Sequence, residues 1–227
     1  MTTRLRRLGL VLAIIGLGFA AGGAYAFLKV QDGYKSLGAF SAAQNVQLTY
    51  NEDGQLVDRG ETAGADAIMA LLTESWNYPV VAGELDPNDP VVNTGSEYMY
   101  QMATVAYHTL HSTQTIVLAE DVEYKGEIFK AGEYQFDVAG RYWADFDRSH
   151  PLEGPARAMA WTATAHALIG ELGVGAVTAS TLQMGLGLAG LFGALAFALI
   201  VAGLGLVWAA RPEPQEVRVL RPAGMPA

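Results

Sequence analysis

The sequence predicts a membrane protein in which two transmembrane α-helices flank a small α+β domain outside the cytoplasm. Two apolar segments without a charged residue predict the helices, and one of them lies near each end of the 227-residue chain. The segment between them mixes polar, acidic and apolar residues, as a folded, water-exposed domain does. The positions of the arginines predict on which side of the membrane that domain lies.

The first apolar segment follows a basic start in the sequence RLRRLGLVLAIIGLGFAAGGAYAFLK. It has no charged residue from Leu8 to Leu28, which is 21 residues. At a rise of about 1.5 Å per residue, this helix covers the ~30 Å apolar core of a bilayer. Ala24-Tyr25-Ala26 has the pattern of a signal-peptide cleavage site, but the apolar part of a signal peptide is usually only about 7–15 residues long. Length therefore favours a retained transmembrane helix over 8–28, after a cytoplasmic N-terminus over 1–7.

The second apolar segment is longer and has no charge from Leu172 to Ala210, which is 39 residues. A chain of this size cannot build a core large enough to bury such a segment, so a bilayer is the environment that accepts it. We predict the second transmembrane helix within 182–210, with its most apolar part over 184–208, and a cytoplasmic tail over 211–227. Neither predicted span contains an ionisable residue, which argues against a proton or ion path.

Charge asymmetry predicts the orientation of the chain. Basic residues next to transmembrane helices remain in the cytoplasm. Residues 29–181 hold 8 Lys+Arg and 21 Asp+Glu, a net charge of −13. We therefore expect the plasma (inner) membrane, two cytoplasmic termini and an extracytoplasmic domain over 29–181, and the acidic balance argues against a nucleic-acid partner. The arginines that flank the two spans are Arg4, Arg6, Arg7, Arg211, Arg218 and Arg221.

The first half of the middle domain predicts a loop with a short helix, a hairpin and a second helix. Residues 32–45 indicate the loop and short helix. Alternation in 46–58 around Asp53-Gly54 indicates the hairpin. Apolar residues recur at helical spacing in 62–76, and three prolines predict a loop over 77–93.

The second half of the domain begins with a helix whose start is marked by Thr94 and Glu97, the spacing of a capping box. This helix is expected to run to about His111. Glycine-punctuated apolar segments over 113–143 predict a small β-meander. A helix from about 155 then leads toward the second span. We expect a kink or break in that helix at Gly170, Gly173 and Gly175.

The candidate catalytic or metal-binding residues of this domain are the histidine pair His108 and His111. Their i,i+3 spacing places them at neighbouring helix positions, as a metal site requires. The other interpretation is a solvated or partner-facing polar stripe that the histidines share with Glu97, Gln101 and Thr104. We favour the stripe and assign no catalytic, cofactor-binding or metal residue and no cofactor. A third metal ligand would have to be His150, His166, Asp145 or Asp147.

Small residues within the two spans are the candidate site for association. Gly18 and Gly22 form a GxxxG pattern in the first span. Small residues allow helices to approach closely, and such packing drives helix association in lipid. The face meets either a partner helix or the other span, although Gly and Ala are also common in membrane helices in general. In the second span the small residues recur every four positions, at Gly190, Ala194, Ala198 and Ala202.

The whole arrangement resembles an actinobacterial family, the prokaryotic respiratory supercomplex association factor 1 family. The pattern combines the anchor RLRRLGLVLAIIGLGFAAGGAYAF, the segment LTESWNYPVVAGELDPNDPVVNTGSEYMYQMATVAYHTLHSTQTIVL and a second anchor with an Arg/Pro tail. The resemblance implies an accessory subunit that contacts both the cytochrome bcc complex (complex III) and cytochrome oxidase (complex IV), without haem or copper of its own. Relatives are also labelled aromatic ring-opening dioxygenases, an activity that would need two histidines and a carboxylate around iron.

From the sequence we therefore expect a non-catalytic accessory subunit that stabilises a respiratory-chain supercomplex in the plasma membrane. Its partners would be membrane lipid and subunits of the cytochrome bcc complex and cytochrome oxidase. Two alternatives stay open. One is a membrane-tethered metalloenzyme, of the iron dioxygenase or zinc hydrolase type, that uses His108 and His111. The other is an extracytoplasmic binding module.

Overall fold

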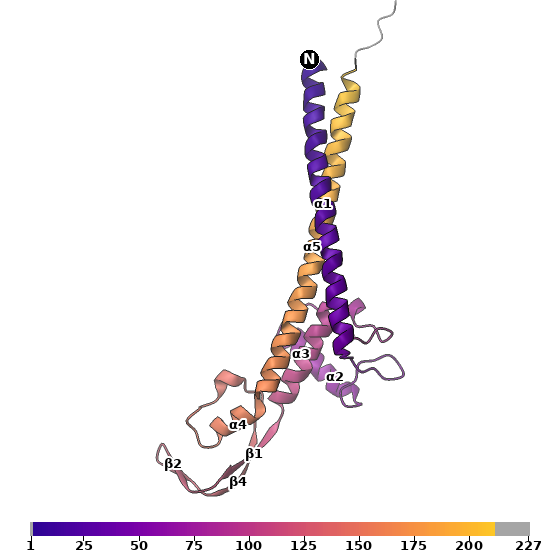
Figure 1. Ribbon diagram of the computed structural model, residues 1–227. Helices are drawn as coiled ribbons and strands as arrows, with labels where there is room; N and C mark the ends of the chain where they lie inside the picture. The colour runs from indigo at the N-terminus through magenta and orange to yellow at the C-terminus, as the bar shows by residue number, and fades with distance from the viewer. Residues whose placement is uncertain (1, 212–227) are drawn as a thin grey trace, which may run out of the picture. The chain divides into compact units, whose positions relative to one another are not determined.

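The computed structural model describes residues 2–211, and the chain divides into two compact units. One unit contains residues 1–31 and 184–227, and the other contains residues 32–183. Helices α1 (Thr2–Gln44) and α5 (Ala163–Ala209) contribute residues to both units (Figure 1). Met1 and residues 212–227, which include Arg218, Arg221 and nearly all of the predicted tail, lie outside the described residues.

Helices α1 and α5 are each long and apolar enough to cross a membrane, with 43 and 47 residues. The predicted spans 8–28 and 184–208 lie within them. Only 11% of the most apolar stretch of each helix is buried inside the protein, whereas the core helix of a water-soluble protein would be mostly buried. Large apolar side chains such as Leu17 and Phe197 are 61% and 71% exposed. By their length, composition and exposure, the two helices could therefore span a membrane.

Helix α1 does not end at the predicted loop over 32–45 but continues to Gln44. Its last turns pack against the domain. The Ser41 hydroxyl lies 2.8 Å from the Tyr98 hydroxyl in a buried hydrogen bond, and Leu37 packs on the domain core. The helix ends where Asn45 adopts a left-handed conformation with φ of 49°, a common way to close a helix. Tertiary packing thus extends the helix beyond the apolar segment that marks it in the sequence.

The core of the 32–183 unit forms around two helices of its own. They are α2 (Thr62–Ala70), which continues into the π-helical turn η1 (Leu71–Ser75), and α3 (Gly95–Leu110). Ile68, Leu72 and Ala103 are fully buried between them. The predicted Asp53-Gly54 turn is present, since Tyr50 and Leu56 form an isolated antiparallel bridge around it. The predicted loop over 77–93 contains one short 3₁₀ turn, η2 (Ala82–Glu84).

The predicted capping box at the start of α3 is confirmed. The Glu97 backbone N–H donates to the Thr94 Oγ1 at 3.3 Å, and the Glu97 carboxylate accepts from the backbone N–H of Thr94 at 2.9 Å. The Asn93 N–H also donates to this carboxylate, at 2.9 Å. Glu97 is only 1% exposed, so it does not lie on the predicted solvated or partner-facing polar stripe. Its carboxylate faces the orphan N–H groups of the helix start instead of water, and burial raises its pKa.

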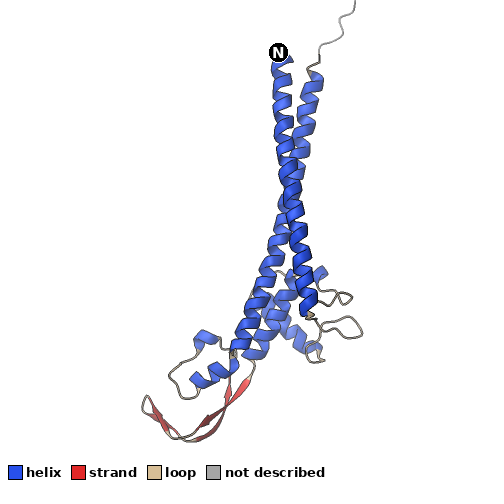
Figure 2. Ribbon diagram, viewed as in Figure 1, coloured by secondary structure: helices blue, strands red, loops and turns tan. Residues whose placement is uncertain are grey.

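The predicted β-meander is in fact a long hairpin with nested pairing. Strand β1 (Thr113–Leu118) pairs antiparallel with β4 (Gly132–Asp137), and between them β2 (Val122–Tyr124) pairs with β3 (Glu127–Phe129). A meander would pair each strand with the next along the chain. Here β2 and β3 are joined by the tight turn Lys125-Gly126, whose φ values are 49° and 85°, as a two-residue hairpin turn requires. Figure 2 shows that the described strands all belong to this one ribbon.

The break before α5 lies earlier in the sequence than predicted. After the 3₁₀ turn η3 (Trp143–Asp145), helix α4 (Glu153–Ala160) ends at Trp161, where ψ is 66°. The Trp161 indole N–H donates to the Arg141 carbonyl at 3.1 Å, which fixes this corner. Helix α5 then runs without interruption through the three glycines expected to break it. Gly175 serves close packing instead, because a methyl group there would overlap the Tyr98 ring.

The raised pKa of Glu97 predicts how stability depends on pH. A carboxyl whose pKa is higher in the folded than in the unfolded state binds its proton more tightly when folded. Its contribution to stability is therefore complete below the usual glutamate pKa of about 4.3 and is lost as pH rises through the folded value. We expect the thermal midpoint of the wild-type protein to fall relative to that of Glu97→Gln as pH rises above 4.

The measurement is near-ultraviolet circular dichroism of the detergent-solubilised protein at several pH values. Glu127→Gln is the matched control, because Glu127 is an exposed glutamate of β3. A pH dependence that is the same in both variants would contradict the burial argument for Glu97.

Candidate functional site

Helices α1 and α5 approach each other within the 1–31 and 184–227 unit through small residues spaced seven apart. A methyl group added to Gly9 would lie 2.5 Å from the Gly203 carbonyl oxygen, and one added to Gly16 would lie 3.0 Å from the Ala196 carbonyl oxygen. The backbones are therefore in contact where the side chains are smallest, and this packing holds apolar helices together in lipid. The buried residues of this row, which we call the heptad row, are Gly9, Gly16, Gly23, Ala189, Ala196 and Gly203.

Sequence reasoning missed the heptad row because it searched for small residues spaced four apart. Gly18, one of the predicted pair, has nothing within 4 Å of an added methyl group, and Gly22 has only the Phe192 ring, at 3.4 Å. At about 100° per residue, Gly18 lies on nearly the opposite side of α1 from Gly16. A seven-residue recurrence of glycine, visible in the printed sequence, was the signal that identifies the contact face.

Three of the predicted small residues of α5 face away from α1, whereas the fourth, Gly190, lines a groove that α1 also borders. Ala194, Ala198 and Ala202 are exposed, and a methyl group at Gly190 would meet no atom within 4 Å. Counted at about 100° per residue, these four positions centre on the side of α5 opposite the heptad row. We call them the outer small-residue face. Its role in binding another helix stays a prediction.

Two apolar hollows border the predicted glycines. A groove of about 500 Å³ lies beside Gly190, and a shallower hollow of about 330 Å³ lies beside Gly18. The rings of Phe19 and Phe192 meet edge to face at 5.6 Å in the second hollow. Neither hollow is lined by a charged side chain, so each offers only van der Waals contact to an apolar group. The groove is lined by Ala20, Gly23, Ala24, Phe27, Leu186, Ala189, Gly190 and Gly193.

The two candidate histidines have separate partners. His108 Nε2 lies 2.9 Å from Asp58 Oδ1, and both side chains are partly shielded from water. His111 Nδ1 donates to the Tyr107 carbonyl at 2.9 Å, and its ring lies 4.1 Å from the Tyr107 ring. Sequence reasoning missed Asp58, which lies in a turn fifty residues earlier in the chain. The pair therefore does not converge on one point.

The expected third ligands are used by the local structure. His150 Nδ1 accepts from the Leu152 N–H at 3.1 Å, and Asp145 accepts from the Tyr142 N–H at 2.8 Å. Asp147 binds the Tyr124 hydroxyl and Lys125, and these two hydrogen bonds hold its pKa well below the usual range. Within residues 2–211, no group of three or more His, Cys, Asp or Glu side chains is arranged to hold a metal ion. The arrangement indicates structural roles for these groups.

Comparison with known proteins adds no relative. No protein family, curated protein or solved structure matches this chain. The resemblance to the supercomplex association factors therefore rests on the sequence pattern alone. What the site can do follows from its geometry, and the geometry offers apolar contact surfaces on the helix pair.

The heptad row predicts that one glycine of α1 is far more sensitive to substitution than its neighbour two residues away. We expect Gly16→Leu to destabilise the helix pair by about 1–3 kcal/mol, because the new side chain enters a filled contact. Gly18→Leu is the matched control: it makes the same gain in helix propensity and meets open space. Thermal unfolding in detergent, followed by tryptophan fluorescence, measures both. Equal midpoints for the two variants would refute the assignment of the contact face.

Proposed function

We propose that this protein is a non-catalytic accessory subunit that associates with and stabilises a respiratory-chain supercomplex of cytochrome bcc and cytochrome oxidase in the plasma membrane. The observation that carries the proposal is the outer small-residue face of α5. This face is exposed along four successive turns while the opposite side of the helix is occupied by α1. The sequence resemblance supplies the identity of the complex.

The physical role of such a subunit is to add contact area. Lipid provides no hydrophobic drive between helices, so a partner helix must be held by close packing, which the outer small-residue face permits. The domain adds a second contact in water. Because both contacts belong to one chain, the second forms at a high effective concentration once the first is made.

The metalloenzyme alternative has less support. It requires His108 and His111 to share a metal with a third group, and within the described residues each histidine has its own structural partner. A tightly bound iron or zinc ion that is lost in a His108→Ala, His111→Ala double variant would favour the enzyme over the accessory subunit.

Deletion of the gene tests the proposal directly. The cytochrome complexes should stay individually active and spectrally intact, since the subunit carries no redox centre under this proposal. What should fall is the fraction recovered as one large particle on native gels, most clearly as detergent is raised. Gels and oxidase spectra that match the parent strain at every detergent level would exclude a role in the supercomplex.

The outer small-residue face predicts which substitutions weaken retention of the subunit. Ala194→Leu with Ala198→Leu places bulk where a partner helix would approach, so the fraction that co-purifies with the cytochromes should fall several-fold. Leu188→Phe with Leu204→Phe is the control, because both leucines are exposed on other sides of α5. Thermal midpoints of the purified variants should match the wild type, which separates lost association from misfolding. Equal retention of both variants would contradict the assignment of this face.

The orientation proposed from the flanking arginines predicts which cysteines are labelled from outside. The chain has no cysteine, so each introduced thiol reports alone. Asn88→Cys, in the DPNDP loop of the domain, should react with an impermeant reagent on wall-permeabilised cells. Val219→Cys, in the tail outside the described residues, should react only after the membrane is opened. The reverse pattern would overturn the proposed orientation.

A further inference from the structure

Two buried hydroxyl groups in the 32–183 unit bond to each other and to no third group. The Ser41 and Tyr98 hydroxyl oxygens lie 2.8 Å apart, and the two residues are 3% and 5% exposed. A hydroxyl has one hydrogen to donate, so whichever of the two donates, the hydrogen of the other stays unused. Among residues 2–211 neither hydroxyl forms another hydrogen bond. The pair therefore holds one buried donor without an acceptor, which folded proteins rarely leave in that state.

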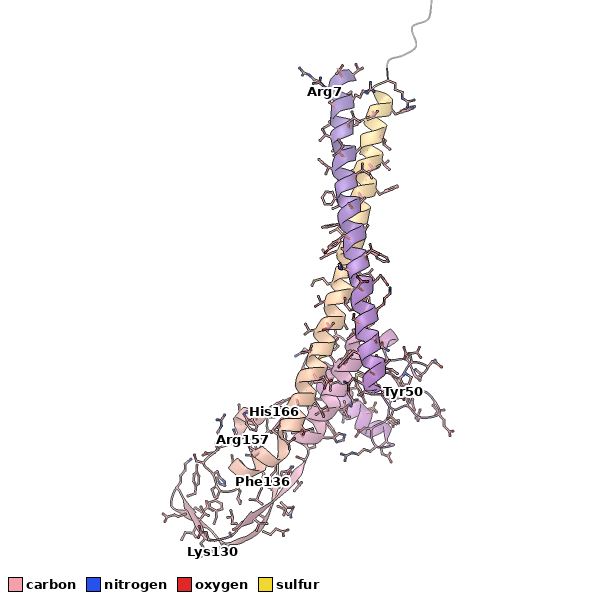
Figure 3. All side chains as sticks on the ribbon, in the orientation of Figure 1. Arg7, Tyr50, Lys130, Phe136, Arg157 and His166 are labelled. Atoms are coloured by element: carbon pink, nitrogen blue, oxygen red, sulfur yellow. The ribbon has the colours of Figure 1, made fainter. Side chains whose placement is uncertain are left out.

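The hydroxyl pair borders a hollow of about 70 Å³. Helix α1, the segment that follows it, α3 and α5 all contribute to the wall, through residues of the 32–183 unit. The labels of Figure 3 help to locate it, because Leu168 follows His166 by two residues on α5 and Val46 precedes Tyr50 by four. Most of the wall is apolar and consists of Phe40, Val46, Val92, Leu168 and Leu172.

Three of these apolar residues are also exposed to water. Phe40, Leu168 and Val46 are 46%, 41% and 37% exposed. Single exposed apolar side chains are ordinary, whereas several gathered around one hollow indicate a surface that something covers. All three lie outside the predicted spans 8–28 and 184–208, and Phe40 is twelve residues, or about 18 Å of helix, beyond Leu28. A bilayer around those spans therefore does not account for their exposure.

The unused donor is held in place before any ligand binds. The Tyr98 ring packs on Gly175, where an added methyl group would overlap it. Ser41 lies in the last turn of α1, and its carbonyl accepts from the Asn45 N–H at 2.9 Å. Because both hydroxyls belong to packed helices, a ligand that accepts the free hydrogen would have to order little of the protein.

We propose that this hollow binds the carbonyl end of a small, neutral, apolar molecule, a ketone or an ester. The carbonyl oxygen accepts the unused hydrogen of the Ser41–Tyr98 pair, and the apolar body covers Phe40 and Leu168. Sites for small molecules commonly combine an apolar wall with a few such fixed polar groups. The volume is well below the ~300 Å³ of a site that encloses a drug-sized ligand, so only one end of the molecule enters. Glu171 also lines the hollow, and its negative charge disfavours an acid.

The location of the site is tested with cyclohexanone and the detergent-solubilised full chain. Saturation-transfer NMR measures binding, with protein-free micelles as the blank. Val46→Phe places a ring in the hollow and should weaken binding at least about tenfold, since the ligand would have to displace a packed side chain. Val117→Phe is the matched control, because Val117 is a 70% exposed valine of β1. This control should change affinity less than about twofold, as other surface substitutions do.

Variants of the hydroxyl pair test the hydrogen bond itself. Tyr98→Phe and Ser41→Ala each leave one hydroxyl with a free hydrogen, so at least one of them should keep the wild-type affinity for cyclohexanone within about twofold. The double variant has no donor and should bind the ketone about three- to tenfold more weakly, the usual net effect of one hydrogen bond. Methylenecyclohexane has a CH₂ group in place of the oxygen, and its binding should not change. All three variants lack the Ser41–Tyr98 bond, so the comparison isolates the donor.

The outcomes decide for or against the site. No cyclohexanone binding beyond that of the micelles, or equal weakening by Val46→Phe and Val117→Phe, would exclude the hollow. A double variant that binds the ketone as tightly as the wild type, or loses both compounds equally, would refute the hydrogen bond. Cyclohexanecarboxylate that binds as tightly as cyclohexanone would contradict the neutral class of ligand. If the double variant does not fold, the two valine variants still test the site.

Discussion

The missing side chains at Gly9, Gly16 and Gly23 are the constraint on which the apolar helix pair depends. Two helices that are apolar on every side gain nothing from hydrophobic burial against each other in lipid, so their attraction must come from contact between atoms. That contact requires the backbones to approach, and the 2.5 Å from an added Gly9 methyl group to the Gly203 oxygen shows that no larger residue fits. One side of α5 is buried in this contact with α1, and the outer small-residue face centres on the opposite side.

The unit of residues 32–183 must instead provide hydrogen-bond partners for its charged side chains and for the backbone N–H groups at the ends of its short elements. The Glu97 carboxylate replaces the water that the N–H groups of Asn93 and Thr94, just before α3, would otherwise bind. Burial of the carboxylate is the electrostatic cost of that arrangement. Asp58 pairs with His108, and His150 accepts from the Leu152 N–H at the start of α4. Asp147 accepts hydrogen bonds from Tyr124 and Lys125 at the hairpin tip. Most titratable groups that sequence reasoning considered for chemistry are thus engaged in holding local structure. This dispersal supports a contact role.

The sequence by itself determined the features that arise from local chemistry. Charge-free length indicated two helices able to span a membrane, Thr94 and Glu97 marked the start of α3, and Asp53-Gly54 marked a turn. Tertiary structure decided what depends on residues far apart in the chain. It extended α1 to Gln44 through contacts with Tyr98. It also placed Gly175 against the Tyr98 ring within a continuous α5, and it paired β1 with β4 instead of with its nearest strand. It also buried Glu97, paired His108 with Asp58, and placed Gly16 instead of Gly18 in the contact with α5. The physical reason is common to all of these: a propensity or a spacing fixes what a segment can form, but which face it buries is set by the partner it meets.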